Sequence, residues 1–151
     1  MNFYTNNKRL YIKLVLILGL VWSFSSCEDD DLRRDNPNLL NLRFDVTLNK
    51  SLPAYNQLNF PGNAIYYPGV ANKGLLVINT GAGILAFDAA DPNIVPRDCS
   101  LLQINGLVGT SSCEIPNSYS LVDGLPMEDG LQYPLYNYRV QETGNIIRIF
   151  N

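Results

Sequence analysis

Hydrophobic and polar residues alternate in short runs from position 41 onward, which is the pattern that antiparallel strands require. In the segment NLRFDVTLN (residues 41–49) every second residue is apolar, so we expect a half-buried strand there. A second short strand, AIYY at residues 64–67, ends at Pro68-Gly69. Apolar positions with a helical period do not occur in this part of the sequence, so it predicts strands and turns with little helix.

Three hairpins are predicted from paired β-rich runs that flank turn residues. The first (residues 74–90) turns at TGAG, residues 80–83, and the second (residues 100–112) has Asn105-Gly106 at its tip, the strongest short-range hairpin signal. The third joins strands at residues 136–141 and 146–150 through a turn at residues 142–144. With a strand and turn in SYSLVDGLPMEDG, these elements predict one all-β domain over residues 41–151, with about eight or nine short antiparallel strands.

The N-terminus has the three-part plan of a secretory signal peptide, predicted over residues 1–26. The basic residues Lys8, Arg9 and Lys13 precede the apolar run LVLILGLVWSF, and small residues follow it. A spanning helix needs roughly 20 apolar residues, and this run has 11 (residues 14–24). The alternative is a short membrane anchor that stays attached to the chain.

The segment FSSC resembles a bacterial lipobox, in which Cys27 is lipidated and becomes the first mature residue. Phe24 departs from the Leu that is usual there. The acidic run EDDD (residues 28–31) resembles the surface-export signal of Bacteroidetes lipoproteins, and its alternative interpretation is a solvated linker. The resemblance implies an outer-membrane lipoprotein on the cell surface or periplasmic face, with residues 27–40 as a flexible acidic tether.

Charge and composition narrow the choice of partners. Three of the 11 Lys and Arg precede Cys27 and none of the 14 Asp and Glu does, so the mature chain carries about −6. It has no basic stripe, so nucleic acid is not an expected partner. The nine tyrosines suggest a protein- or glycan-binding face, or half-buried strand residues whose hydroxyls reach water.

The remaining cysteines, Cys99 and Cys113, predict a disulfide in an envelope compartment. A three-residue loop centred on Gly106 would place Cys99 opposite Cys113 in the second hairpin, and a two-residue Asn105-Gly106 turn would place it opposite Ser112. In both cases the sulfurs lie near each other, within the span that a disulfide accepts. The alternative is a dithiol metal site.

From about Leu75 to the C-terminus the order of features resembles a Rieske iron–sulfur domain. The matching pieces are AFDAADPN, the Asn-Gly hairpin, SSCEIPNSYSLVDGLP, YPLYNYRV and GNIIRI. The resemblance covers about half of the chain. It implies an antiparallel β-sandwich or small barrel that carries an inserted hairpin subdomain.

The resemblance also indicates where cluster ligands would fall. The family holds its [2Fe-2S] cluster with two Cys and two His, and these positions correspond here to Asp91, Asn93, Ser112 and Ile115. The chain contains no histidine. We therefore expect no cofactor and no metal, with the cysteine pair acting as a brace like the extra disulfide of some Rieske proteins.

The absence of histidine also excludes several other kinds of catalytic site. Without histidine the chain has no Ser-His-Asp triad, Cys-His dyad or His-based zinc site, and GAG at residues 81–83 is a turn between strands. Asp88, Asp91 and Glu114 are candidates for an ion or acid–base site, or for turn caps. The expected function is a non-catalytic binding or structural lipoprotein. The alternative is electron transfer through a non-standard cluster or the Cys99/Cys113 couple.

Overall fold

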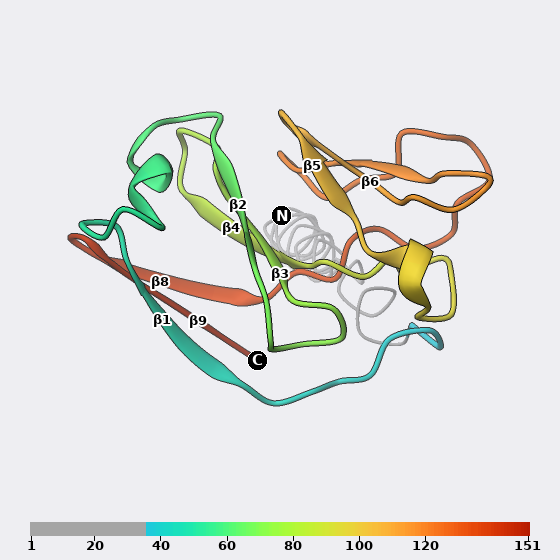
Figure 1. Cartoon of the computed structure of the whole chain (residues 1–151), viewed down its shortest axis with the longest axis horizontal. Coiled ribbons are helices and arrows are strands. Elements are labelled where there is room, and N and C mark those ends of the chain that lie inside the picture. The colour runs from blue at the N-terminus through green and yellow to red at the C-terminus, as the bar shows by residue number, and fades with distance from the viewer. Residues whose placement is uncertain (1–35) are drawn as a thin grey trace, which may run out of the picture. The chain divides into compact units, whose positions relative to one another are not determined.

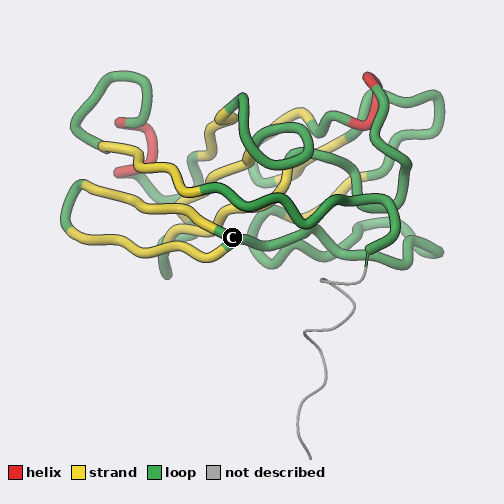
Figure 2. Tube along the Cα trace, turned by 90° about the horizontal axis from the view of Figure 1, so that it is seen from below, coloured by secondary structure: helices red, strands yellow, loops and turns green. Residues whose placement is uncertain are grey.

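The computed structural model describes residues 36–151, and the regular structure in this span is almost entirely β (Figure 1). Two short 3-10 helices, η2 (Asn56–Asn59) and η3 (Asp98–Ser100), lie at opposite ends in both views (Figures 1 and 2). Among residues 36–151, no helix has the length and apolar character needed to cross a bilayer. Because the regular structure of the described chain consists of strands and two short 3-10 helices, the all-β prediction is confirmed. The predicted signal peptide, Cys27 and the acidic run lie outside the described residues.

In the described part of the chain, nine strands form three antiparallel sheets of three strands each, in the orders β1-β9-β8, β2-β3-β4 and β5-β6-β7. In chain order the strands are β1 (Asp45–Asn49), β2 (Ala64–Tyr67), β3 (Leu75–Asn79), β4 (Ile84–Asp88), β5 (Gln103–Asn105), β6 (Val108–Thr110), β7 (Ser118–Ser120), β8 (Arg139–Thr143) and β9 (Ile146–Phe150). The three predicted hairpins correspond to β3-β4, β5-β6 and β8-β9.

The central strand β3 of the β2-β3-β4 sheet is buried on both faces. On β3, Leu75 and Val77 belong to a core shared with residues of β1 and β9, whereas Leu76 and Ile78 belong to a second core. All four side chains are fully buried. A strand covered on both faces needs a continuous apolar run instead of alternation, and LLVI supplies it.

The β5-β6-β7 sheet is inserted in the sequence between β4 and β8 and contributes to the second core. Tyr119 on β7 is fully buried in this core, together with Leu102 and Leu121. The predicted inserted hairpin therefore exists, and it carries a third strand because β7 pairs with β6, with Gly109 opposite Tyr119.

Three predicted boundaries are wrong. Residues 36–40, predicted to be part of the flexible tether, pack on the domain, with Asn36 and Leu39 buried. β1 begins at Asp45 instead of residue 41 because pairing with β9 stops at Phe150. β8 begins at Arg139 instead of residue 136, because residues 136–138 bond to β4: the N–H of Tyr138 donates to the carbonyl of Ala86 at 2.8 Å.

Candidate functional site

Two loops that the sequence assigns to the ligand positions are tied together beside the third sheet. The β4–β5 loop (residues 89–102) and the β6–β7 loop (residues 111–117) are joined by the Cys99–Cys113 disulfide, with a Cα–Cα distance of 4.8 Å. The N–H of Ser112 also donates to the carbonyl of Cys99 at 2.9 Å. The predicted disulfide is therefore confirmed. We refer to these two segments as the loop pair.

The geometry that links the cysteines differs from the predicted cross-strand pair. Asn105 pairs with Val108, so the hairpin loop consists of Gly106 and Leu107. Gly106 has φ +61°, which matches the requirement of a type II′ turn for glycine at its first central position. Neither predicted register is present, because Cys99 lies in η3 before β5 begins. The loop pair, rather than the strand ladder, brings the two sulfurs together.

Asp91 is the buried centre of the loop pair. Its carboxylate is fully buried and accepts three hydrogen bonds: from the hydroxyl of Tyr119 at 2.6 Å, the amide Nδ2 of Asn117 at 2.9 Å and the backbone N–H of Asn93 at 2.9 Å. Burial, and then the hydrogen bond to Asp91, raise the pKa of Tyr119 well above its ordinary value. The hydroxyl thus stays protonated and donates to the carboxylate.

Asn93 has all of its side-chain hydrogen-bonding groups engaged with protein atoms. Its Nδ2 donates to the Tyr119 hydroxyl at 2.9 Å and to the carbonyl of Tyr133 at 2.7 Å. Its Oδ1 accepts the backbone N–H groups of Gln132 and Tyr133 at 2.9 and 3.0 Å. Asn93 therefore connects the loop pair to the segment that leads into β8.

Ser112 and Ile115 do not join Asp91 and Asn93. Ser112 is exposed and its hydroxyl contacts the Cys99 carbonyl at 3.4 Å, while Ile115 is 80% exposed. The residues that do meet Asp91, Tyr119 and Asn117, were not singled out from the sequence. Tyr119 had a usable signal, since it stands alone as an aromatic residue between Ser118 and Ser120 on a short strand.

Asp88 forms a separate and similar network. Its Oδ2 accepts the Tyr138 hydroxyl at 2.7 Å and the Nδ2 of Asn72 at 2.7 Å, and its Oδ1 accepts the N–H of Ala90 at 2.8 Å. Burial, and then the charge of Asp88, raise the pKa of Tyr138. Asp88, Asp91 and the exposed Glu114 do not gather into an ion site. Within residues 36–151 no group of three or more acidic, Cys or His side chains could hold a metal ion.

A Rieske cluster does not fit the residues at the loop pair. Both cysteines of the pair are consumed by the disulfide, and the chain has no histidine to supply imidazole. The Asp91 and Asn93 side chains already hold protein partners, and buried polar groups are costly to leave unpaired. We therefore derive no chemistry through such a cluster.

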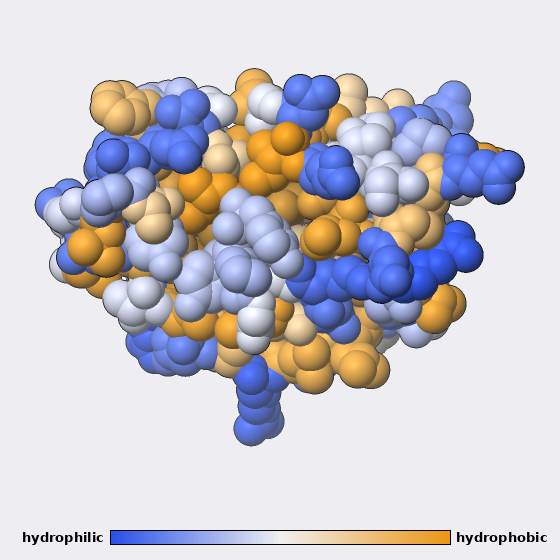
Figure 3. Space-filling model, in the orientation of Figure 1, coloured by the Kyte–Doolittle hydropathy of each residue, from blue (hydrophilic) through white to orange (hydrophobic). Residues whose placement is uncertain are grey.

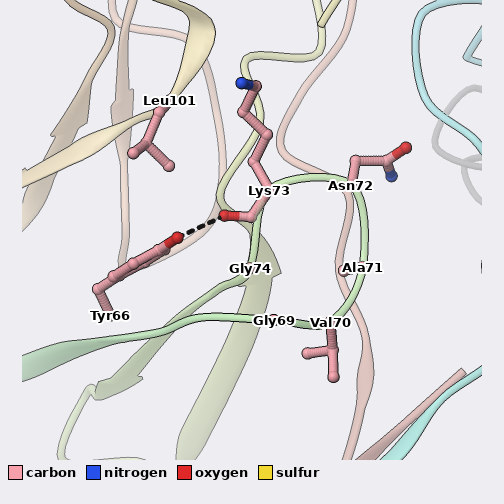
Figure 4. A pocket seen from close by; sticks show the side chains of 8 residues that line it. All are labelled: Tyr66, Gly69, Val70, Ala71, Asn72, Lys73, Gly74 and Leu101. Atoms are coloured by element: carbon pink, nitrogen blue, oxygen red, sulfur yellow. Dashed lines mark hydrogen bonds between the residues drawn. The ribbon is translucent and has the colours of Figure 1, made fainter. Parts of the chain in front are cut away.

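A shallow groove of about 330 Å³ lies between the β2–β3 loop and Leu101 (Figure 4). Its polar groups are largely engaged, since the Tyr66 hydroxyl donates to the Lys73 carbonyl at 2.9 Å and the Asn72 amide bonds to Asp88. The predicted tyrosine face is not assembled here, because Tyr66 alone lines the groove. Tyr119, Tyr136 and Tyr138 are buried.

Two of the tyrosine hydroxyls, those of Tyr119 and Tyr138, differ from the expectation that they reach water. They donate instead to the buried aspartates Asp91 and Asp88. Space-filling Figure 3 shows apolar and polar residues intermixed on the face in view. No binding face of one chemical kind stands out there.

Comparison with known proteins gives structural neighbours only. No family model and no curated protein sequence matches the chain. Among solved structures, a chain from the complex of reduced oxygenase and oxidized ferredoxin in carbazole 1,9a-dioxygenase is 14% identical, with a TM-score of 0.47, covering 74% of this chain and 94% of its own. The ferredoxin of carbazole 1,9a-dioxygenase from Nocardioides aromaticivorans is 15% identical, with a TM-score of 0.44, covering 69% and 96%.

A third neighbour is assigned as the small subunit of an NADH-dependent nitrite reductase from Mycobacterium tuberculosis. It is 17% identical, with a TM-score of 0.43, and the match covers 74% of this chain and 97% of that one. At TM-scores below 0.5, these three matches assign neither a fold family nor a cofactor nor a function to this chain.

Proposed function

We propose that this protein is a cell-envelope lipoprotein whose Rieske-like domain works without a cluster, in a non-catalytic binding or structural role. The observation that carries the proposal is that Asp91 and Asn93, at two of the four positions where ligands are expected, are hydrogen-bonded to Tyr119. A site that binds a cluster would keep its ligand atoms free to bind the metal. Here the corresponding side chains hold the fold together.

The disulfide supports the same proposal. Iron–sulfur clusters are bound by thiolates, and the Cys99–Cys113 bond removes the two thiols of the loop pair. The disulfide also joins the β4–β5 loop to the β6–β7 loop at one end of the loop pair. At the other end, Asn117 of the β6–β7 loop is hydrogen-bonded to Asp91 of the β4–β5 loop. The loop pair is thereby held in shape without a metal.

The anchor part of the proposal rests on the sequence. FSSC with Cys27, preceded by an apolar run of 11 residues, supports lipidation, and the acidic run after it supports placement on the outer membrane. A protein or glycan partner fits a chain that is acidic and lacks a basic stripe. We place the protein on the cell surface or the periplasmic face.

One preparation tests both parts of the proposal. The purified protein should be colourless, contain no iron by elemental analysis, and show thiols only after denaturation and reduction. Visible absorption that scales with bound iron would overturn the cluster-free assignment. Metabolic labelling with a radioactive fatty acid should mark the wild-type chain and not Cys27→Ala, and equal labelling of the two would refute the anchor.

A second candidate function is redox chemistry at the disulfide. Cys99 and Cys113 are each partly exposed, so a small thiol can reach them. In graded thiol–disulfide buffers, a redox protein would exchange its disulfide while still folded. The structural role predicts instead that the bond resists reduction until the domain unfolds. Alkylation of the released thiols, followed beside the circular dichroism signal, separates these outcomes.

A further inference from the structure

The outer end of the loop pair carries apolar side chains that the fold leaves in solvent. Val95 is 70% exposed and Ile115 is 80% exposed, the two highest values among the large hydrophobic residues of the described chain. Pro96 and Pro116 beside them are exposed as well. We call residues 94–96 and 115–116 the loop end. The two loops that carry these residues are joined by the Cys99–Cys113 disulfide and by the Asn117–Asp91 hydrogen bond. Exposed apolar residues on two loops joined in this way indicate an interaction surface.

The loop end is held in place by the contacts described above. The disulfide joins Cys99 to Cys113, two residues before Ile115, and Asn117 binds Asp91 two residues after it. Val95 follows Asn93, whose side chain is bonded at both of its polar atoms. The two apolar loops are thus presented on a fixed support.

The described chain begins beside this same surface. The side-chain amides of Asn36 and Asn38 each donate to the carbonyl of Pro92, both at 2.9 Å, and Asn36 is buried. The described chain therefore begins in contact with the β4–β5 loop at Pro92. Pro92 lies three positions before Val95 in the same loop.

We propose that the loop end docks on the lipid bilayer to which the chain is anchored. This inference rests on the proposed lipidation of Cys27. Eight residues separate Cys27 from Asn36, and an extended chain spans at most about 3.3–3.6 Å per residue, so Asn36 lies within about 30 Å of the anchor. Such a short tether holds the loop end at high effective concentration over the membrane.

Apolar insertion, not charge, drives the docking. The charged residues next to the loop end are Arg97, Asp98 and Glu114, all exposed, one basic and two acidic. This set gives no attraction to anionic headgroups. Docking is therefore expected on zwitterionic lipid, with the apolar side chains in the boundary between headgroups and acyl chains.

The test uses tryptophan as a depth probe. The single Trp of the chain is residue 22, in the predicted signal peptide, so the mature protein has none. Val95→Trp and Ile115→Trp are made separately, with Phe60→Trp as the matched control: Phe60 is 63% exposed and follows η2, at the opposite end from η3. Each full chain is produced in a bacterium, purified from membranes and reconstituted in phosphatidylcholine vesicles that contain a lipid with a nitroxide near the headgroup.

The expected result is about twofold or greater quenching of the tryptophans at positions 95 and 115 by the nitroxide lipid, relative to the Phe60→Trp control, because side chains at the boundary lie within about 5–10 Å of the headgroups. In the Ile115→Trp background, Val95→Asp should return the quenching to the control level. Quenching equal to the control, in protein that floats with the vesicles, overturns the docking and leaves the lipoprotein proposal intact.

Two other outcomes are informative in different ways. Wild-type protein that does not float with the vesicles overturns the anchor and the docking together. Tryptophans that are shielded from aqueous acrylamide but not quenched by the nitroxide lipid indicate that a second copy of the chain covers the loop end, which overturns the assignment to lipid.

Discussion

Replacing Tyr119 by Phe removes one buried hydroxyl and leaves the ring in place. The hydroxyl donates to Asp91 at 2.6 Å and accepts from Asn93 at 2.9 Å. After the substitution Asp91 keeps two donors, while Asn93 still reaches the carbonyl of Tyr133. No cavity of side-chain size forms, so the cost lies in the hydrogen bonds.

A hydrogen bond to a charged group contributes about 1.5–3 kcal/mol. Because Asp91 is buried, water does not readily replace the missing donor, and we expect Tyr119→Phe to lower the free energy of unfolding by about 2 kcal/mol. That is roughly a thirtyfold change in the unfolding equilibrium. With a urea m-value of about 1–3 kcal/mol/M for a small protein, the unfolding midpoint should fall by about 1 M.

The matched control is Tyr66→Phe. Tyr66 is 44% exposed, and its hydroxyl donates to the Lys73 carbonyl at 2.9 Å, where water can take its place. We expect its cost to be below about 0.5 kcal/mol. Urea unfolding followed by far-ultraviolet circular dichroism measures both variants. If Tyr119→Phe shifts the midpoint no further than Tyr66→Phe, the Asp91 network does not stabilise the loop pair.

Three further predictions follow from the same contacts. Burial holds the pKa values of Tyr119 and Tyr138 above the ordinary tyrosine value, so the unfolded chain loses these protons first as the pH rises through about 10. The free energy of unfolding should therefore be complete below that pH and fall above it by about 1.4 kcal/mol per pH unit for each tyrosine. Urea midpoints measured at increasing alkaline pH should show this slope, and a flat profile contradicts it. Replacing Cys99 and Cys113 by Ser should cost roughly 3 kcal/mol, since the bond closes a loop across a separation of 14 residues; equal midpoints with and without reductant in the wild type would argue against this role. Asn93→Ala should speed amide hydrogen exchange in the segment before β8 while leaving β1 unchanged, and uniform acceleration would show that the effect is not local.

The local parts of the fold can be predicted from the sequence because turn chemistry is local. The TGAG turn and the Asn-Gly tip marked two hairpins, and the apolar run on β3 marked a strand. Boundaries that depend on distant partners could not be predicted. Residues 136–138 belong by pattern to the last hairpin, yet they bond to β4, about 50 positions earlier in the chain.

In the candidate site, too, some features can be predicted from the sequence and others depend on tertiary packing. The positions of Asp91 and Asn93 follow from the Rieske resemblance, and the Cys99–Cys113 pairing follows from the cysteine count. Tyr119 is the hydrogen-bond partner of Asp91, 28 positions away, and only tertiary packing brings it there. The outward orientation of Ile115 is likewise invisible to a comparison of motifs, because it depends on how the β6–β7 loop rests on its neighbour.

The strand β3 contributes alternate residues to two hydrophobic cores. Any local opening that removes β3 from one core also exposes the residues that it contributes to the other core, so neither core can unfold by itself. The domain should therefore unfold as a single foldon, with the amides of β3 exchanging only through global unfolding. Although the described chain has three separate sheets, one five-residue strand makes them a single thermodynamic unit.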